Sequence, residues 1–574
     1  MTKENYWLKN SKILKWGKFP QTELVIKNDN YFDFFPDGEI SVYENCITQH
    51  IKNGFKNKTA IITVDSKKKF KNYTYSKIDN LVNNFILFIK SKNNKPFRNT
   101  RIMIHSSASI NSATSMLACT KVGIFFSVIF EDLEYDAILK RSKLFKPDII
   151  FTSKSNIKKF KKLKNRNIKI YYFEDINSKF NYKKKSKYLI NKNFKSTQNF
   201  FTLFTSGSTG IPKGVIHTIG GYTFYAKYSS KKQFGISSDS IILTASDAGW
   251  INGHTYALFG PLLNGATTIL IEKPMMLIDH NLLEKILSLG VTVLYLPVTL
   301  IRIMRSLFPK KNFFTNDLLA IGSMGEPLAY SVGKWFSDTF SFKKKAVVNT
   351  YFQTETGGII MSPKFNDDLK NAPHGSVGNV ISKEIKISKL YSNLKKEVII
   401  KTPWPGCMKK IINGKKEWKK YWSKDGFRMF DLATRKKNTF YIHGRVDDVI
   451  NIRGHRIGSE EIESTLLKIN GIRECCAISL QDDLAGNKIY IFLCSMKKNF
   501  NEQIEDILIK NFGTFAIPEN IFYLSDLPKT RSGKILRRLL RNILMDPKSN
   551  NYGDVSTLMQ KDLINEIKNN ILKS

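Results

Sequence analysis

The sequence predicts an α/β protein: a large N-terminal domain of layered sheets and helices, composed of several subdomains, and a small mobile C-terminal α+β domain. Short apolar runs alternate with amphipathic stretches over the first part of the chain, a pattern typical of sheets covered by helices. Near Pro403 the sequence becomes turn-rich and strand-like, and a smaller βα-type segment begins at Asp448. With 574 residues, the chain is long enough for about three or four domains with buried cores.

The expected strands are short apolar runs, which lie at residues 101–107, 127–130, 148–153, 168–173, 200–204, 240–246, 266–272 and 291–297. A helix is expected over residues 460–469. We place the domain boundary at Asp447, so that the large domain spans residues 1–446 and the small domain residues 447–545. Residues 546–574 are polar apart from one short helix-like stretch, and we expect them to be a peripheral tail.

The charge composition bears on whether the protein binds nucleic acid or another polyanion. The formal net charge is +42, but the lysines are spread along the whole chain, which favours a solvated surface over a specific nucleic-acid face. The densest cluster, between Lys158 and Lys187, could meet an anionic ligand such as the nucleotide end of coenzyme A, although surface charge explains it equally well. A non-catalytic protein that binds polyanions is therefore the alternative from a different class.

Neither a membrane segment nor a disulfide framework is expected. No run of eighteen apolar residues occurs, and the N-terminus lacks an apolar signal core. The six cysteines include no CxxC pair, so reduced thiols are expected and a structural zinc site is not. These features predict a soluble protein of the cytoplasm.

Residues 205–214, which read TSGSTGIPKG, set small hydroxyl residues and glycines ahead of a lysine. Directly after a strand, glycines let backbone N–H groups approach an anion closely, so the loop suits the phosphates of ATP. It differs from the GxxxxGK[ST] pattern of P-loop nucleotidases. By itself, such a loop could equally be a solvated turn.

Five further segments agree with a phosphate-binding role: DAGWINGHTYALFGPLLNGATTILIE from Asp247, GSMGEP from Gly322, YFQTETGG from Tyr351, GRVDDVINIRGHRIG from Gly444 and LPKTRSGKILRR from Leu527. In this order and at these separations, the six segments resemble the adenylate-forming superfamily of AMP-binding enzymes. The resemblance is strongest to the acetyl-CoA and propionyl-CoA synthetase branch, and it covers roughly residues 43–541.

The resemblance implies an ATP-dependent ligase. Such an enzyme activates a short-chain carboxylic acid, for example acetate or propionate, as an acyl-adenylate, and transfers the acyl group to coenzyme A with release of AMP and pyrophosphate. ATP, Mg²⁺ and coenzyme A are the implied cofactors and co-substrates. A carboxylate with a pKa of about 4 is already a nucleophile, so the enzyme mainly has to stabilise charge on the phosphate oxygens.

The resemblance also assigns roles to residues. The phosphate-binding loop comprises Thr205, Ser206, Gly207, Ser208, Thr209, Gly210 and Lys213. The adenine pocket comprises Gly325, Glu326, Pro327, Asn349, Thr350, Tyr351 and Phe352, followed by Gln353. Thr354 would serve phosphate and Glu355 would bind Mg²⁺.

The remaining implied roles concern the ribose and the second domain. Asp431 would accept hydrogen bonds from both ribose hydroxyls, and Arg445 would lie beside the ribose and phosphates. Asp447 would be the hinge, and Lys534 would contact the developing carboxyl-phosphate oxygen. Arg456 would meet phosphate in one domain orientation, whereas Gly454 would line the pantetheine channel in the other. The branch usually has aspartate at position 349 and glycine at position 430, where this chain has Asn349 and Phe430.

The acyl pocket implied by the resemblance is formed by Ile251, Asn252, Met324 and Phe352. Acetate enzymes carry valine, threonine, valine and tryptophan at these positions, so all four differ. Phe352 enlarges the pocket, and Ile251 and Met324 refill part of it. One or two methylenes shift discrimination by about 1–3 kcal/mol.

Two alternatives concern the substrate. Asn252 is costly in an apolar pocket unless it is paired, which keeps a hydroxy- or oxo-substituted short acid open. An enzyme that delivers an amino acid to a carrier protein would need a carboxylate for the substrate ammonium, and the four pocket positions offer none.

Overall fold

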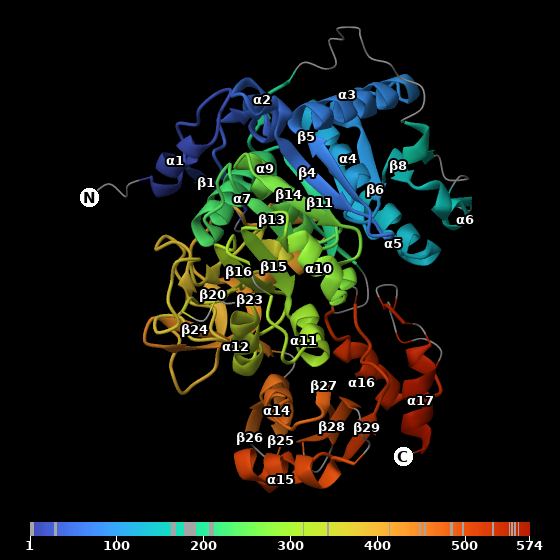
Figure 1. The fold of residues 1–574 in the computed structure, drawn as a ribbon, viewed down its shortest axis with the longest axis vertical. Helices are drawn as coiled ribbons and strands as arrows, with labels where there is room; N and C mark the ends of the chain where they lie inside the picture. Colours follow the sequence, from blue (N-terminus) through green and yellow to red (C-terminus); the bar gives the residue numbers. More distant parts are fainter. Residues whose placement is uncertain are drawn as a thin grey trace.

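A computed structural model describes residues 5–27, 31–161, 163, 168–176, 191–205, 212–313, 315–340, 342, 344–412, 414–446, 449–452, 455–482, 486–495, 499–530, 533–549, 552, 555, 558–560 and 562–573. Two domains of unequal size are visible, the smaller one in orange and red (Figure 1). The expected hinge Asp447 lies outside the described residues, between a strand that ends at Arg445 and one that begins at Val449.

The first large sheet has the strand order β21 (Lys410–Ile411), β12 (Lys213–Thr218), β11 (Asn199–Thr205), β7 (Phe125–Ile129), β6 (Arg101–His105), β8 (Ile149–Thr152) and β9 (Lys169–Tyr172). The strands from β11 to β9 are parallel, and β12 pairs antiparallel with both β11 and β21. Helices α4 (Ile110–Val122) and α5 (Tyr135–Phe145) make the crossovers that parallel strands require. Ser109 and Ser112 form a capping box at the start of α4.

The second large sheet has the order β17 (Val348–Asn349), β16 (Ala320–Met324), β15 (Val293–Pro297), β13 (Ile241–Thr244), β14 (Thr267–Ile271), β4 (Thr59–Val64) and β5 (Phe70–Thr74). Only β5 is antiparallel to its neighbour. The associated helices are α3 (Tyr75–Lys92), α7 (Ile219–Phe234), α10 (His280–Leu287), α11 (Val298–Leu307) and α12 (Tyr330–Thr339). The central strands are buried along almost their whole length, which explains their unbroken apolar sequences.

A third sheet completes the large domain. It pairs β20 (Lys396–Ile400), β23 (Gly426–Lys436) and β22 (Trp422–Ser423), and β24 (Thr439–Arg445) joins β23. Helix α13 (Lys415–Tyr421) precedes β22. Shorter elements are α1 (Tyr6–Asn10), α2 (Gln49–Lys52), α6 (Ile157–Phe160), α8 (Ile251–His254), α9 (Gly260–Leu263), β1 (Leu24–Ile26), β2 (Phe32–Phe34), β3 (Glu39–Ile40), β10 (Phe194–Lys195), β18 (Met361–Ser362) and β19 (Asn379–Val380).

The small domain is an α+β unit. It contains the hairpin β25 (Val449–Ile452) and β26 (His455–Gly458), and a sheet of β27 (Ile472–Asp482), β28 (Gly486–Ser495) and β29 (Asn520–Tyr523). Its helices are α14 (Ser459–Leu466), α15 (Asn501–Phe512), α16 (Arg537–Met545) and α17 (Leu563–Lys573). The predicted α/β class, with a small second α+β domain, is confirmed.

The tail differs from the expectation of a peripheral segment. Leu558, Leu563 and Ile567 are buried in the same apolar cluster as Leu540 of α16, and Met559 N donates to the Lys529 carbonyl. The apolar residues were too widely spaced in a polar sequence to reveal this face. The end of the chain therefore packs on the small domain as an integral part of its core.

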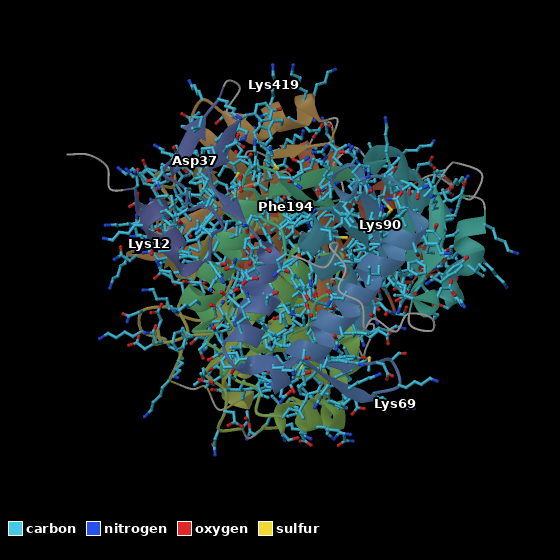
Figure 2. The ribbon with its side chains drawn as sticks, turned by 90° about the horizontal axis from the view of Figure 1, so that it is seen from above. Lys12, Asp37, Lys69, Lys90, Phe194 and Lys419 are labelled. Carbon is cyan, nitrogen blue, oxygen red and sulfur yellow. The ribbon has the colours of Figure 1, made fainter. Side chains whose placement is uncertain are left out.

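Lysine side chains reach several edges of the molecule. In the view of Figure 2, Lys12 lies toward the left edge, Lys419 at the top and Lys69 at the lower right. None of the helices within the described residues is both long and apolar enough to cross a lipid bilayer.

Candidate functional site

The glycine-rich loop connects two antiparallel strands of the first large sheet. Thr205 ends β11 and Lys213 begins β12, and the two residues are opposite each other in the register. Ser206, Gly207, Ser208, Thr209 and Gly210 lie outside the described residues. The Lys213 ammonium is 3.6 Å from a carboxylate oxygen of Glu417 and lies 5.4 Å from the centre of the Tyr421 ring. Helix α13 therefore holds the lysine at the base of this loop.

Thr354 and Glu355 form a short 3₁₀ turn together with Thr356. Glu355 is buried, and its Oε1 accepts a hydrogen bond of 2.6 Å from the Tyr421 hydroxyl. Burial and the Glu355 carboxylate raise the pKa of Tyr421, so the phenol stays protonated and remains a donor. A buried carboxylate fixed by a neutral donor is a suitable ligand for Mg²⁺.

The Asp431 carboxylate is held by three side chains. Its Oδ2 accepts hydrogen bonds from the Tyr351 hydroxyl at 2.8 Å and from Gln353 Nε2 at 2.7 Å. Arg445 Nη1 lies 3.7 Å from Oδ1. Burial raises the pKa of Asp431, and the positive charge of Arg445 opposes that shift. The sequence pointed to Asp431 and Arg445 separately, and the fold brings them together through the pairing of β23 with β24.

Phe430 adopts the left-handed backbone conformation for which the acetyl-CoA and propionyl-CoA synthetase branch usually has glycine. Its φ is 56°, in the left-handed region that favours glycine. The Phe430 ring packs under the guanidinium groups of Arg428 and Arg445, at 4.7 and 5.6 Å, contacts that help to offset the backbone cost. The departure from glycine thus leaves the turn before Asp431 intact.

The expected adenine-pocket segments lie at the ends of adjacent strands. Asn349 in β17 accepts from Ser323 Oγ at 2.9 Å and donates to the Ser376 carbonyl at 2.9 Å, so its amide is satisfied within the protein. The Thr350 hydroxyl is bonded to Tyr295 at 2.6 Å.

The segment that follows β16 was expected to line the adenine pocket, and one of its side chains, that of Glu326, has another partner. Gly325 has a φ of 92° and open space where a Cβ would point, and Pro327 follows it half-buried. The Glu326 carboxylate, in contrast, pairs with Arg302 of α11. Its side chain is thereby directed to that helix.

Asn252 contacts Met324 in the expected acyl pocket. Asn252 Nδ2 lies 2.7 Å from the Met324 sulfur, and Ile251 and Met324 are both buried. Phe352 packs edge-on against Tyr256, with ring centres 5.6 Å apart. Within the described part of the chain, the buried Asn252 Oδ1 has no hydrogen-bond partner.

Lys534 belongs to the small domain and extends toward the large one. Thr299 Oγ1 of α11 donates to the carbonyl of Gly533 at 2.9 Å. Lys534 itself is exposed. This bond brings the segment that carries Lys534 against helix α11 of the large domain.

Three predicted residues cannot be placed in the site. Asp447 and Gly454 lie outside the described residues, and Arg456 is described only as part of strand β26. Conversely, sequence reasoning missed Tyr421, Thr299 and Arg302. They come from helices α13 and α11, far from Glu355 and Gly533 in the sequence, and no local pattern distinguishes them.

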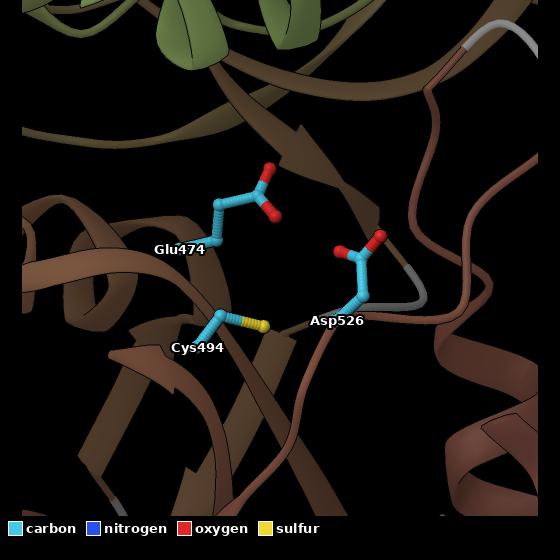
Figure 3. Close-up of side chains that lie close together, drawn as sticks. All are labelled: Glu474, Cys494 and Asp526. Carbon is cyan, nitrogen blue, oxygen red and sulfur yellow. The ribbon is translucent and has the colours of Figure 1, made fainter. Parts of the chain in front are cut away.

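A second cluster of metal-type ligands lies in the small domain. Glu474, Cys494 and Asp526 converge (Figure 3), with one ligand atom of each within 4.8 Å of the others. The Lys529 ammonium already lies among them, 2.5 Å from Glu474 and 2.6 Å from Asp526. A resident cation at these carboxylates would face the repulsion of that lysine, so the cluster does not fit a metal ion.

Comparisons with known proteins agree with this geometry. The profile of the AMP-binding enzyme family matches residues 48–394, and the profile of the AMP-binding enzyme C-terminal domain matches residues 461–534. An acetyl-coenzyme A synthetase of Helicobacter pylori (strain G27) is 31% identical, over 98% of this chain and 92% of its own length. An acetyl-coenzyme A synthetase of Vibrio cholerae serotype O1 is 29% identical, over 98% and 93%.

Two solved structures share the fold. The acetoacetyl-CoA synthetase from Streptomyces lividans superposes with a TM-score of 0.83 at 14% identity, covering 99% of this chain and 92% of that one. An anthranilate CoA ligase in complex with anthranoyl-AMP gives a TM-score of 0.75 at 17% identity, covering 88% of this chain and 97% of its own. Taken with the two family profiles and the full-length relatives, the geometry places this chain in the AMP-binding enzyme family of adenylate-forming proteins.

Proposed function

We propose that the protein is an AMP-forming acyl-CoA synthetase for a short-chain carboxylic acid. In the first step, a carboxylate oxygen attacks the α-phosphorus of ATP, and the bond to pyrophosphate breaks. In the second step, the thiol sulfur of coenzyme A attacks the acyl carbon, the bond to AMP breaks, and the thiol proton passes to solvent. Acetyl-coenzyme A synthetases align along almost the whole chain, which supports this reaction.

The observation that carries the proposal is the set of side chains that fixes the Asp431 carboxylate, together with the bond from Thr299 of the large domain to the Gly533 carbonyl, next to Lys534. Asp431, fixed by Tyr351 and Gln353, would accept hydrogen bonds from the ribose hydroxyls. Lys534 would then place its ammonium at the oxygen shared by the carboxyl group and the α-phosphate. A positive charge at that position stabilises the first transition state.

Glu355 and Thr354 would hold the metal-bound phosphates, with Lys213 at the base of the phosphate loop. Mg²⁺, when bound, neutralises charge on the phosphate oxygens. Tyr421 orients Glu355 by its short hydrogen bond. The Glu355 carboxylate is therefore oriented before ATP binds, as electrostatic stabilisation requires.

For the acid, Phe352 in place of tryptophan favours a pocket larger than one for acetate, while Ile251 and Met324 refill part of the space. Propionate and butyrate are thus proposed to be used at least as well as acetate. Among the described residues the Asn252 Oδ1 has no hydrogen-bond partner, which favours a second candidate, a short acid with a hydroxyl group that can donate to it. We propose reduced cysteines and a cytoplasmic location, with no specific nucleic-acid partner.

The experiment is a panel of acids offered to the purified protein with ATP, Mg²⁺ and coenzyme A. Unbranched C2 to C8 acids and their 2- and 3-hydroxy forms are scored by coenzyme A-dependent AMP release. We expect release with at least one C2 to C4 acid. No release with any acid, together with polynucleotide binding that weakens steeply with salt, would favour the polyanion-binding alternative.

A further inference from the structure

The start of helix α11 is fixed within the core of the large domain. Strand β15 ends at Pro297, which pairs with Met324 of the expected acyl pocket, and α11 begins at the next residue. Val298 and Ile301 are buried in an apolar cluster of this domain. Between them, Thr299 is only 4% exposed. The Thr299 side chain therefore has a defined position relative to the acyl pocket.

The described residues around Lys534, here called the lysine turn (residues 529–530 and 533–535), are held together by backbone hydrogen bonds. Thr530 N donates to the Lys534 carbonyl, and Gly533 N donates to the Thr530 carbonyl, both at 2.8 Å. Lys534 N in turn donates to Thr530 Oγ1 at 3.1 Å. The position of Gly533 therefore determines where the backbone of Lys534 lies.

The lysine turn is anchored in the small domain. The Lys529 ammonium binds Glu474 at 2.5 Å and Asp526 at 2.6 Å, and Figure 3 shows these two acids. Lys529 also pairs with the buried Ile535 in an antiparallel bridge. The turn is thus carried by the small domain as one unit.

A hydrogen bond joins the lysine turn to α11 across the domain boundary. Thr299 Oγ1 donates to the Gly533 carbonyl at 2.9 Å. The approach is close, because a Cβ built on Gly533 would lie 2.5 Å from both Cβ and Oγ1 of Thr299. Gly533 also has a φ of 83°, in the left-handed region that favours glycine. Helix α11 lies at the boundary of the two domains in Figure 1, where it also contacts β27.

We propose that Thr299 is a positioning residue for the adenylation step: its hydroxyl holds the Gly533 carbonyl, and so keeps the lysine turn against the large domain when Lys534 acts. This role rests on the proposed function for its catalytic consequence. Thr299 does not contact the reacting atoms. It acts through the placement of the lysine turn.

The physical reason is the hydrogen bond that the Gly533 carbonyl needs in this orientation. Gly533 is buried, and a buried carbonyl without a donor is unfavourable. Valine resembles threonine in shape but cannot donate, so Thr299→Val removes this donor. In an orientation that takes the turn away from α11, water can replace the hydroxyl. The loss should therefore affect adenylation, and spare acyl transfer, which is expected to use the other domain orientation.

The first test separates the half-reactions. Thr299→Val should slow pyrophosphate exchange by about tenfold or more, yet keep acyl transfer from supplied acyl-adenylate to coenzyme A within about twofold. Thr299→Ser retains the donor and should keep the exchange rate within about threefold. The matched control is Ser306→Ala, which removes an exposed hydroxyl from the same helix and should leave both rates unchanged.

The second test asks whether Gly533 and Thr299 touch during adenylation. Gly533→Ala adds a methyl group that would meet Thr299, and Thr299→Gly removes the atoms that it would meet. The strain of alanine at a positive φ is common to both backgrounds and cancels in a double-mutant cycle. We expect Gly533→Ala to slow pyrophosphate exchange about fivefold more when Thr299 is present than in the Thr299→Gly background.

The third test needs no substrate. All six cysteines are buried, so spin labels attach selectively to cysteines introduced at exposed positions. Tyr330→Cys on α12 and Met545→Cys on α16 label the two domains, because these side chains are 61% and 69% exposed. Pulsed dipolar spectroscopy gives the population with the label separation of this structure. Its ratio to all other populations should fall about threefold or more in Thr299→Val and stay unchanged in Ser306→Ala.

An unchanged label distribution in Thr299→Val overturns the proposal, and so does an original protein that lacks the separation of this structure. Equal loss of both half-reactions also overturns it, because Thr299 would then serve the fold, and so does an absence of coupling between Gly533 and Thr299. If the original protein activates no acid, the proposed function fails, whereas the label separations still decide whether Thr299 sets the domain orientation.

Discussion

The part of the site proposed to bind ribose, around Asp431 and here called the ribose corner, and the proposed acyl pocket are built differently. In the ribose corner, the Asp431 carboxylate is bonded by Tyr351 and Gln353, with Arg445 beside it. On the acyl side, three buried polar atoms of one short segment have no partner among the described residues: Trp250 Nε1, Asn252 Oδ1 and His254 Nε2. One part of the site is internally satisfied, while the other keeps unused hydrogen-bonding capacity.

The difference corresponds to what each part would bind under the proposed function. ATP is the same for every member of such a family, so its partners can be arranged in advance. The acid differs between enzymes, and unsatisfied buried polar atoms next to its pocket call for an explanation, such as a bound water or a polar substrate. The comparison predicts that changes in the ribose corner affect all acids equally, and that changes in the acyl pocket affect their ranking.

The largest effect is expected for Asp431→Ala. It removes the acceptor proposed for two ribose hydroxyls, and hydrogen bonds to a charged group contribute about 1.5–3 kcal/mol each. The kcat/KM for ATP in pyrophosphate exchange should fall by about a hundredfold or more, by the same factor for every acid. A loss below threefold, or one that depends on the acid, would remove Asp431 from the ribose site.

Tyr421→Phe tests the phosphate side. The variant keeps the ring that packs on Phe427 but removes the donor to Glu355. Loss of such a supporting partner typically weakens metal binding by about 10–100-fold, so the Mg²⁺ concentration for half-maximal exchange should rise by that order. Tyr330→Phe is the control, because Tyr330 is an exposed tyrosine. An unchanged Mg²⁺ requirement contradicts the role of Tyr421.

Two buried histidines, His254 and His217, should lower the stability of the folded protein at acidic pH. Burial lowers the pKa of His254 to about 3 and that of His217 to about 4. Below a pH of about 6.5 the unfolded chain binds protons that the folded chain does not, so stability falls with pH by up to about 1.4 kcal/mol per pH unit per histidine, down to the folded pKa.

Urea unfolding between pH 7.5 and 5 measures this slope. His254→Gln should reduce the slope of the unfolding free energy against pH by the contribution of one histidine, which is at most about 1.4 kcal/mol per pH unit. This reduction is expected whatever the variant's stability at pH 7.5. Identical slopes in the two proteins would mean that folding does not lower the pKa of His254, which would contradict this account of the buried histidine.

Phe352→Trp should give the smallest effect. Restoring an indole reduces the space beside Tyr256 and should shift the ratio of kcat/KM for acetate over propionate upward by about tenfold. The kcat/KM for ATP should stay unchanged, in contrast to Asp431→Ala. If the ratio does not move, Phe352 does not border the acid, and selectivity rests on Ile251, Asn252 and Met324.

Local sequence was sufficient for the strands and for the α/β class. Residues 101–107, 240–246 and 291–297 each contain a strand, because buried parallel strands carry continuous apolar runs. The insertion of β4 beside β14 joins segments more than two hundred residues apart. No local pattern encodes that pairing, and the burial of Leu558 and Ile567 in the tail was missed for the same reason.

In the site, motifs predicted positions but not the directions of side chains. Asp431 and Arg445 were assigned to the ribose corner and do lie together. No sequence motif indicates that Glu326 pairs with Arg302 or that Tyr421 bonds to Glu355. Both contacts depend on helix packing between distant segments, which is fixed only when the whole domain has folded.

The measurement that tests the central claim most directly compares the two half-reactions of Lys534→Ala. Lys534 follows Gly533, whose carbonyl accepts a hydrogen bond from Thr299 of the large domain, and only the adenylation step develops charge where the Lys534 ammonium is proposed to lie. Pyrophosphate exchange should fall by at least a hundredfold, while transfer from supplied acyl-adenylate to coenzyme A stays within twofold of the original protein. Equal loss of both half-reactions, or retention of both, would contradict the proposed role of Lys534.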